Sequence, residues 1–127
     1  MALASVSISL EIHMALIFPR LARNFIKNGY FPTDAVTLGR ILPALALADP
    51  DRPVRLLDPC CGEGAALHDL KNALATHAGT SDTLRAFGVE YDRERAWHAK
   101  GVLDTVAHTD VHDMFITARS MGLLFLN

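Results

Sequence analysis

A short glycine-containing loop between an apolar strand and a helix constrains the fold more than any other feature of this chain. Residues 54–57 predict a buried strand, the loop 58–64 (DPCCGEG) follows directly, and a helical pattern runs from Ala65 to about Thr76. Glycines in such a loop adopt positive φ angles and let a ligand approach the backbone. The first N–H groups of the following helix have no partner within it. The segment therefore predicts a ligand-binding turn at the carboxyl end of a strand.

Strands and helices continue to alternate along the rest of the chain. Residues 86–90 predict a second strand, 93–103 a helix, 106–110 a third strand, 111–118 a short helix and 122–126 a wholly apolar fourth strand. This alternation gives right-handed crossovers and a parallel sheet, and an apolar strand is typical of a sheet covered on both faces. We expect an α/β fold, a Rossmann-like three-layer sandwich with a mostly parallel sheet. We expect it to be incomplete, with about four strands, because doubly wound sheets normally continue beyond the fourth.

The residues before the loop predict one more helix and a boundary. A helix is expected at residues 35–47, capped by Thr33 or Asp34 and kinked or split by Pro43. The turn-rich residues 49–53 follow it. A chain of 127 residues with 50% hydrophobic residues can bury one core. We interpret residues 1–19 as an N-terminal extension and residues 20–127 as one domain.

Charge and cysteine content limit the expected partners. Twelve basic residues against 14 acidic ones give a net charge of −2, which provides no polycationic surface for nucleic acid. Cys60 and Cys61 are adjacent and fit neither a disulfide framework nor a spaced metal site, so a reducing cytosol is favoured and no metal is expected. No apolar run is long enough to span a bilayer. The chain is therefore predicted to be cytoplasmic, with no membrane partner.

The charges of the loop indicate which ligand it takes. A pyrophosphate-binding GxGxxG loop would need glycine where Leu67 stands, and the carboxylates of Asp58 and Glu63 would repel phosphate. The same carboxylates suit the ammonium and sulfonium charges of S-adenosylmethionine. Glu90, at the end of the second strand, is placed to accept hydrogen bonds from both ribose hydroxyls. The loop and this acid together favour S-adenosylmethionine as the cofactor.

Two more residues at strand ends extend this interpretation to the adenine. Tyr91 follows Glu90 and is placed to cover the ring, and Asp110 ends the third strand, where its carboxylate can accept from the adenine amino group. Purely structural interpretations stay open: the glycines can form only a tight turn, and Asp58 only a helix cap. Several other residues are expected to be structural: Cys60 and Cys61 as small packed residues, Trp97 between helix and sheet, and Arg93 and Arg95 at a solvated helix start. His108 and His112 have the spacing of a helical metal pair, but a strand end is expected between them.

The order of these motifs resembles class I S-adenosylmethionine-dependent methyltransferases, and in particular the branch that methylates amino groups in DNA. Residues 57–64 resemble the first motif of that family, which implies that Asp58, Cys60, Gly62 and Gly64 contact the cofactor. Glu90 resembles the second motif, and Asp110 resembles the third.

The segment before the first strand carries a further part of the resemblance. Residues 28–33 (NGYFPT) are similar to the stretch that closes over the methionine end of the cofactor, which implies that Tyr30 and Thr33 bind it. More narrowly, residues 23–33 and 90–100 resemble a group of bacterial, plasmid and phage methyltransferase-like proteins. The resemblance covers about residues 20–127.

The resemblance leads to two hypotheses about function. In the DNA-methylating branch the fourth strand leads into Asn-Pro-Pro-Tyr, and Asn127 stands where the catalytic asparagine would. The first hypothesis is therefore the S-adenosylmethionine-binding portion of an N6-adenine-type methyltransferase, truncated, inactive alone, and reaching DNA through a missing C-terminal part. The second is a non-catalytic, methyltransferase-derived interaction protein, such as a phage or mobile-element inhibitor of a host system. In that case a protein partner or a second copy would cover the exposed sheet.

Overall fold

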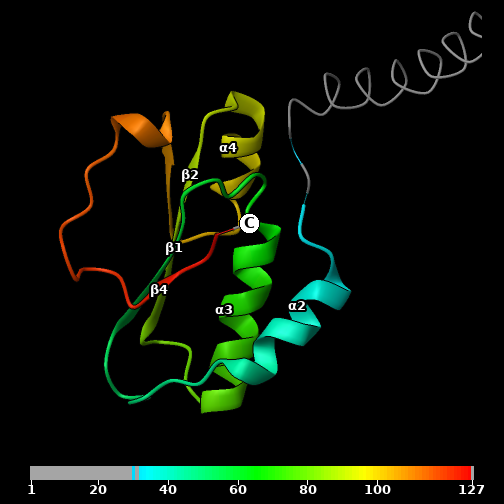
Figure 1. Ribbon diagram of the computed structural model, residues 1–127, viewed down its shortest axis with the longest axis vertical. Coiled ribbons are helices and arrows are strands. Elements are labelled where there is room, and N and C mark those ends of the chain that lie inside the picture. Colours follow the sequence, from blue (N-terminus) through cyan, green and yellow to red (C-terminus); the bar gives the residue numbers. More distant parts are fainter. Residues whose placement is uncertain (1–29, 31, 127) are drawn as a thin grey trace, which may run out of the picture. The chain divides into compact units, whose positions relative to one another are not determined.

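A four-stranded parallel sheet forms the centre of the described chain. The structure is a computed structural model that describes residue 30 and residues 32–126, so the proposed extension 1–19 and Asn127 lie outside the described residues. The strands are β1 (Val54–Asp58), β2 (Leu84–Glu90), β3 (Thr105–His108) and β4 (Leu123–Leu124), in the order β3-β2-β1-β4 (Figure 1). Every neighbouring pair is parallel. The predicted α/β fold with a parallel sheet of about four strands is confirmed.

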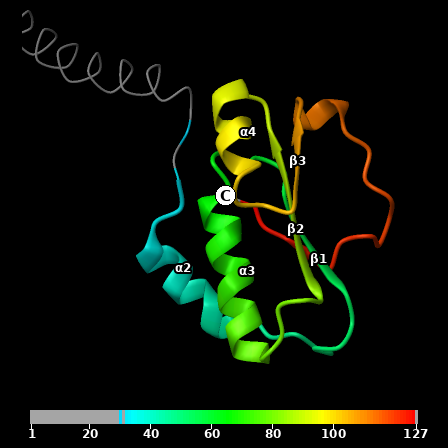
Figure 2. The same ribbon diagram turned by 180° about the vertical axis from the view of Figure 1, so that it is seen from behind.

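The helices of the described residues lie on one side of this sheet. They are α2 (Ala35–Ile41), α3 (Ala65–Ala78) and α4 (Arg93–Ala99), and both views show them on the same side (Figures 1 and 2). Two successive right-handed crossovers, β1 to β2 and β2 to β3, place α3 and α4 on a common face. Residues 109–122 return to β4 along the other side, with only the 3₁₀ helix η2 (Val111–Asp113). The described residues therefore form two of the three expected layers, namely the sheet and one layer of helices. Among these helices, none combines the length and apolarity that crossing a membrane requires.

Helix α3 contributes three buried leucines to the core that packs against β1 and β2. Leu67, Leu70 and Leu74 recur at spacings of three and four residues, and all three are buried with Leu56 of β1 in one cluster. Burying one such side chain contributes roughly 1.5–3 kcal/mol. Gly79, in the left-handed conformation, ends the helix, and its N–H bonds Ala75 and Thr76 carbonyls. The carboxyl end of β1 is thus fixed by a packed helix directly after the loop.

Local sequence signals predicted which helices and strands form better than they predicted where each one ends. Pro43 splits the helix expected at 35–47, so α2 ends at Ile41 and the 3₁₀ helix η1 (Leu42–Ala44) follows. Asp34 is the N-cap, with its side chain accepting from the Thr37 N–H at 2.9 Å. The helix expected at 111–118 is wrong beyond residue 113. The fourth strand covers only two residues, and Leu124 is 53% exposed because β4 is an edge of the sheet that the described residues form.

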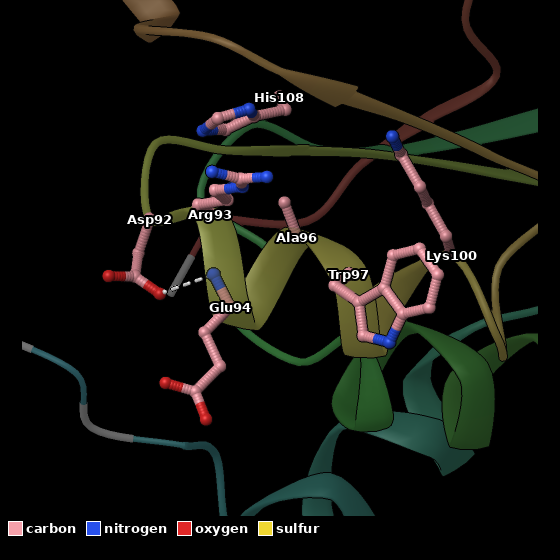
Figure 3. Close-up of a pocket in the computed structure, with 7 residues that line it drawn as sticks. All are labelled: Asp92, Arg93, Glu94, Ala96, Trp97, Lys100 and His108. Atoms are coloured by element: carbon pink, nitrogen blue, oxygen red, sulfur yellow. Dashed lines mark hydrogen bonds between the residues drawn. The ribbon is translucent and has the colours of Figure 1, made fainter.

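The expectation that Trp97 packs between helix and sheet is wrong. Ala96 and Ala99 are the buried residues of α4, whereas the indole of Trp97 is 75% exposed. The small alanines let α4 lie close to the sheet and leave the larger side chain on the outer surface. Trp97 lines an open pocket of about 610 Å³ formed by α4, its N-cap residue and His108 of β3 (Figure 3).

Candidate cofactor-binding site

The strand order predicts a ligand site at the carboxyl end of β1. Strands β2 and β4 lie on opposite sides of β1, so the order of the sheet reverses there. Open parallel sheets bind ligands at such a switch point, outside the carboxyl ends of the strands. Residues 59–64 leave β1 at this point, between Asp58, the last residue of the strand, and the start of α3.

Two glycines and two hydrogen bonds from backbone N–H groups fix the conformation of the loop. Gly62 and Gly64 have φ angles of 57° and 83°, a region that favours glycine, and Gly64 is the N-cap of α3. The N–H of Cys61 donates to the Val89 carbonyl at 2.8 Å, and the Cys60 N–H donates to Asp58 Oδ1 at 2.9 Å. The predicted positive φ angles of the glycines are confirmed. The bond to Asp58 also shows that its carboxylate caps a turn of the loop and not the helix.

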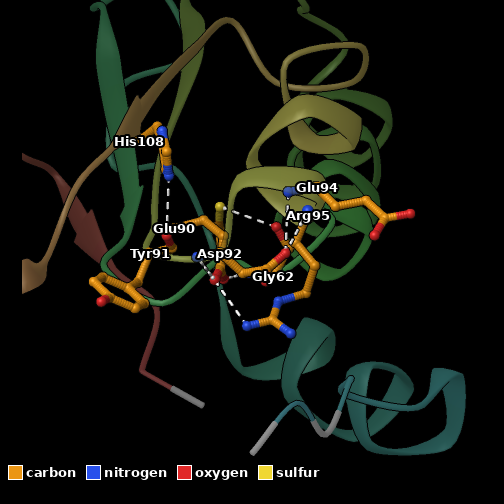
Figure 4. A network of polar contacts seen from close by, with 8 residues as sticks. Gly62, Glu90, Tyr91, Asp92, Glu94, Arg95 and His108 are labelled. Atoms are coloured by element: carbon orange, nitrogen blue, oxygen red, sulfur yellow. Dashed lines mark hydrogen bonds and ion pairs between the residues drawn. The ribbon is translucent and has the colours of Figure 1, made fainter. Parts of the chain in front are cut away.

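The carboxylate of Glu90 connects the loop to the end of β2. Its Oε2 accepts from the Gly62 N–H at 2.9 Å, and its Oε1 accepts from the Asp92 N–H at 2.8 Å. The Arg95 guanidinium Nη2 donates to the same Oε1 at 3.1 Å. Figure 4 shows this carboxylate between Gly62 and the guanidinium. A carboxylate offers about four acceptor positions, so about one remains for a ligand unless a donor is displaced.

A second buried carboxylate lies beside Glu90. Asp58 is only 3% exposed, and its pKa is raised to about 6, chiefly by burial and also by the negative charge of Glu90. The hydrogen bond from the Cys60 N–H opposes this shift. Two like charges in a partly desolvated site repel each other, and a bound cation would relieve that repulsion. The electrostatics of the site therefore favour a positively charged ligand.

The two loop cysteines are not poised as nucleophiles. Burial raises the pKa of the Cys61 thiol to about 12, with further contributions from Asp58 and Glu90. The pKa of Cys60 is raised by partial burial and by the charges of Asp58, Glu90 and Asp110. Both thiols stay protonated near neutral pH, and only a thiolate attacks efficiently. Cys61 is buried as expected, whereas Cys60 is exposed, so the packing expectation is wrong for Cys60.

The other residues expected at the site differ in their surroundings. Asp110 follows β3, and its Oδ1 accepts from the His112 N–H at 2.9 Å as the cap of η2. Tyr91 is exposed, and its ring points away from the Glu90 carboxylate (Figure 4). The Thr33 hydroxyl is buried without a hydrogen-bond partner among the described residues. An unpaired buried hydroxyl is costly, so it fits a ligand contact. The cofactor contacts of these residues and of Tyr30 stay predictions.

Two residues that matter for the geometry of the site were not identified from the sequence. The expectation that Arg95 belongs to a solvated helix start is wrong, because its side chain is 16% exposed and paired with Glu90. Gly88 of β2 lies beneath the loop, where an added Cβ would stand 2.6 Å from the Cys61 Sγ. A glycine inside a strand is a signal of close backbone approach, and it was available in the sequence. The contact between Arg95 and Glu90 depends on how α4 leaves its cap, and no pattern in the sequence specifies that.

The family of the chain follows from comparison with known proteins. A family model described as "Uncharacterised methyltransferase family (DUF6094)" matches residues 4–127. The chain belongs to this methyltransferase family. The resemblance noted from the motifs is thereby confirmed at the level of a methyltransferase family. No curated protein matches the chain significantly.

Two solved structures have a similar fold to this methyltransferase-family chain. One is a type I restriction-modification system methyltransferase subunit from Streptococcus thermophilus, with a TM-score of 0.59 and 16% identity over 76% of this chain and 22% of that one. The other is the plantazolicin methyltransferase BpumL in complex with a pentazolic desmethylPZN analogue and SAH, with a TM-score of 0.53 and 19% identity over 85% of this chain and 40% of that one. The chain spans less than half the length of either protein. The Rossmann-like fold predicted from the sequence is confirmed.

Proposed function

We propose that this chain is the S-adenosylmethionine-binding portion of a methyltransferase that acts on the N6 amino group of adenine in nucleic acid. One observation carries the cofactor assignment: the glycine loop donates to the buried Glu90 carboxylate beside a second buried acid, Asp58. The complex of the structurally similar BpumL with SAH supports the cofactor class. The nucleic-acid substrate rests on the resemblance of the motif order to the DNA-methylating branch.

Each part of the cofactor has a matching group in the site. Glu90 accepts from the ribose hydroxyls, with Arg95 yielding an acceptor position on Oε1, and Asp58 faces the ammonium group of the methionine part. The positive-φ glycines leave room for close approach of the ligand to the backbone. When bound, S-adenosylmethionine supplies an electrophilic methyl group on its sulfonium. Asn127, the proposed catalytic residue, lies outside the described residues, and we expect methyl transfer to need elements that follow β4.

Calorimetric titration of the whole chain with S-adenosylmethionine and with its demethylated product tests the cofactor assignment. We expect saturable binding of both at a stoichiometry of about one. A folded protein that gives no binding signal with either compound would overturn the assignment. Labelled S-adenosylmethionine incubated with the chain, DNA and a carrier protein tests the substrate class, and any transferred label is expected on the DNA. Label on the protein and not on the DNA would contradict the nucleic-acid assignment.

A non-catalytic interaction protein is a second candidate, and one feature of the surface favours it. Apolar side chains on β4 and on the segments before and after it are exposed to solvent: Phe115 (100%), Ile116, Leu124 and Leu126. Exposed apolar side chains beside a sheet edge are typical of a surface that another chain covers. Gel filtration with light scattering distinguishes the two proposals. A stable dimer supports the second candidate, and a monomer that binds the cofactor argues against it.

A further inference from the structure

The pocket between α4 and β3 combines an exposed aromatic ring with three basic side chains. Trp97, Arg93, Lys100 and His108 all line it, and all four are exposed. Figure 3 shows the nitrogen-bearing ends of Arg93, Lys100 and His108 gathered on the β3 side of α4, with the indole of Trp97 beside Lys100. We call these four residues the Trp97 pocket. None of them belongs to the proposed cofactor site.

The two acidic residues of the pocket form no ion pair with its three basic side chains, although the pKa of Asp92 is lowered, chiefly by the hydrogen bond from the Arg95 N–H and, as a smaller contribution, by the charge of His108. In Figure 3 the carboxylates of Asp92 and Glu94 point away from the three basic groups. Asp92 is also engaged as the cap of α4, because its Oδ1 accepts from the Glu94 and Arg95 N–H groups at 3.1 and 3.0 Å. The basic face therefore stays available to an anion.

His108 is held in place by the backbone of the neighbouring strand end. Its Nε2 lies 3.0 Å from the carbonyl oxygen of Tyr91, which can only accept, so Nε2 is assigned as the donor. The imidazole is thereby fixed at the wall of the pocket, across from α4. A ligand in the pocket would meet a positioned ring and not a freely rotating one.

An exposed tryptophan flanked by arginine and lysine suits one class of ligand best. Nucleobases stack on indole rings whatever their sequence, and phosphates pair with the neighbouring basic groups. A volume of about 610 Å³ is enough for a nucleotide unit. A protein helix would need a continuous apolar stripe, whereas Glu94 and His98 make the rest of the exposed α4 surface polar.

We propose that the Trp97 pocket binds a single strand of nucleic acid, with one base stacked on the indole and adjacent phosphates paired with Arg93 and Lys100. The proposal deepens the proposed function, since it rests on a nucleic-acid substrate, but it does not depend on cofactor binding. The net charge of −2 argues for weak, local binding, with a Kd on the order of 10⁻⁴–10⁻⁶ M.

The chain offers a direct readout, because Trp97 is its only tryptophan. A short single-stranded oligothymidine titrated into the whole chain is expected to quench the fluorescence of Trp97 saturably. Added salt should weaken the binding through loss of the phosphate contacts. The double variant Arg93→Gln/Lys100→Gln is expected to raise the Kd at least about tenfold. The matched control, Arg40→Gln/Arg52→Gln, removes two exposed arginines elsewhere and should leave the Kd unchanged.

Substitution of the ring separates stacking from charge. Measured by anisotropy of a labelled strand, Trp97→Ala should lose about tenfold or more in affinity, and Trp97→Phe should keep part of it. Unchanged affinity in Trp97→Ala, or in Arg93→Gln/Lys100→Gln, would overturn the proposal. Quenching by heparin or inorganic phosphate as strong as that by the oligonucleotide would overturn it too, since it would leave only a general anion site.

A cofactor titration distinguishes failure of this proposal from failure of the proposed function. Arg93→Gln/Lys100→Gln is expected to bind S-adenosylmethionine as tightly as the unaltered chain, because neither side chain is among the hydrogen-bond or ion-pair partners of Glu90 and the loop in the described residues. Strand binding by a chain that does not bind the cofactor would sustain the pocket and overturn the cofactor assignment. Cofactor binding without strand binding would sustain the cofactor assignment and overturn the proposed role of the Trp97 pocket.

Discussion

The backbone N–H of Gly62 donates a 2.9 Å hydrogen bond to Oε2 of Glu90, 28 residues away in the sequence. This bond ties the loop after β1 to the end of β2. Because the donor is a backbone N–H, this bond forms only when the loop has the conformation that the positive φ angles of its glycines allow. The same carboxylate is the group proposed to hold the ribose, so we expect the conformation of the loop and cofactor binding to depend on each other.

Replacing Glu90 by glutamine tests that link. Glu90→Gln keeps the shape but removes the charge opposite Arg95, and its amide places a donor where a backbone N–H already donates. We expect the Kd for S-adenosylmethionine to rise about 10- to 100-fold, or roughly 1–3 kcal/mol. Calorimetry measures this. The control is Glu94→Gln, an exposed acid of α4, and equal weakening in both variants would contradict the assigned role of Glu90.

Asp58 is expected to strengthen cofactor binding but to lower the free energy of unfolding near neutral pH. Its folded-state pKa of about 6 lies above the ordinary aspartate pKa of 3.8, so the folded state holds the proton more tightly than the unfolded chain. The cost of the ionised carboxylate is therefore absent below about pH 4, grows as pH rises through 6, and is complete above it. Asp58→Asn should raise the free energy of unfolding by on the order of 1–3 kcal/mol near neutral pH. Urea unfolding at about pH 7.5 and about pH 4.5 should show this advantage shrinking at the lower pH.

Cofactor affinity should depend on pH through the same residue. The ammonium group of S-adenosylmethionine favours the ionised Asp58 carboxylate, so affinity is expected to fall as pH drops through about 6. Binding near that pH should also release a proton, which calorimetry in buffers of different ionisation enthalpy detects. Asp58→Asn should bind more weakly and lose this pH dependence. A chain whose affinity is flat between about pH 5 and pH 7.5 would argue against contact of Asp58 with the ammonium.

The packing of the loop on β2 gives a prediction with an internal control. Gly88→Ala would place a Cβ 2.6 Å from the Cys61 Sγ and 2.7 Å from the Leu103 Cδ1, so these two buried side chains must shift. We expect a loss of roughly 1–3 kcal/mol in unfolding free energy, together with weaker cofactor binding. Gly39→Ala in α2 meets no atom within 4 Å and should instead stabilise by about 0.5–1 kcal/mol. Thermal unfolding of the two variants compares them, and a Gly88→Ala protein as stable as Gly39→Ala would refute the close approach.

The strand and helix pattern was predictable because it depends on short-range periodicity. The fold class, the glycine loop and the position of Glu90 all follow from residues within one strand or one turn. The weak points were the elements with little local signal. The segment 111–118 gives only a 3₁₀ turn, and the short β4 is fixed by pairing with β1 and not by its own sequence.

The sequence by itself determined the alternating α/β order, the positive-φ turn after the first strand, and the acids at the strand ends, since these depend on neighbours in the chain. Only the tertiary structure decided that Arg95 pairs with Glu90, that Gly88 lies under Cys61, and that Trp97 faces solvent. These contacts depend on the angle and depth at which α4 and the loop pack on the sheet. That packing is set by the buried alanines and leucines of the whole core, and no local pattern encodes it.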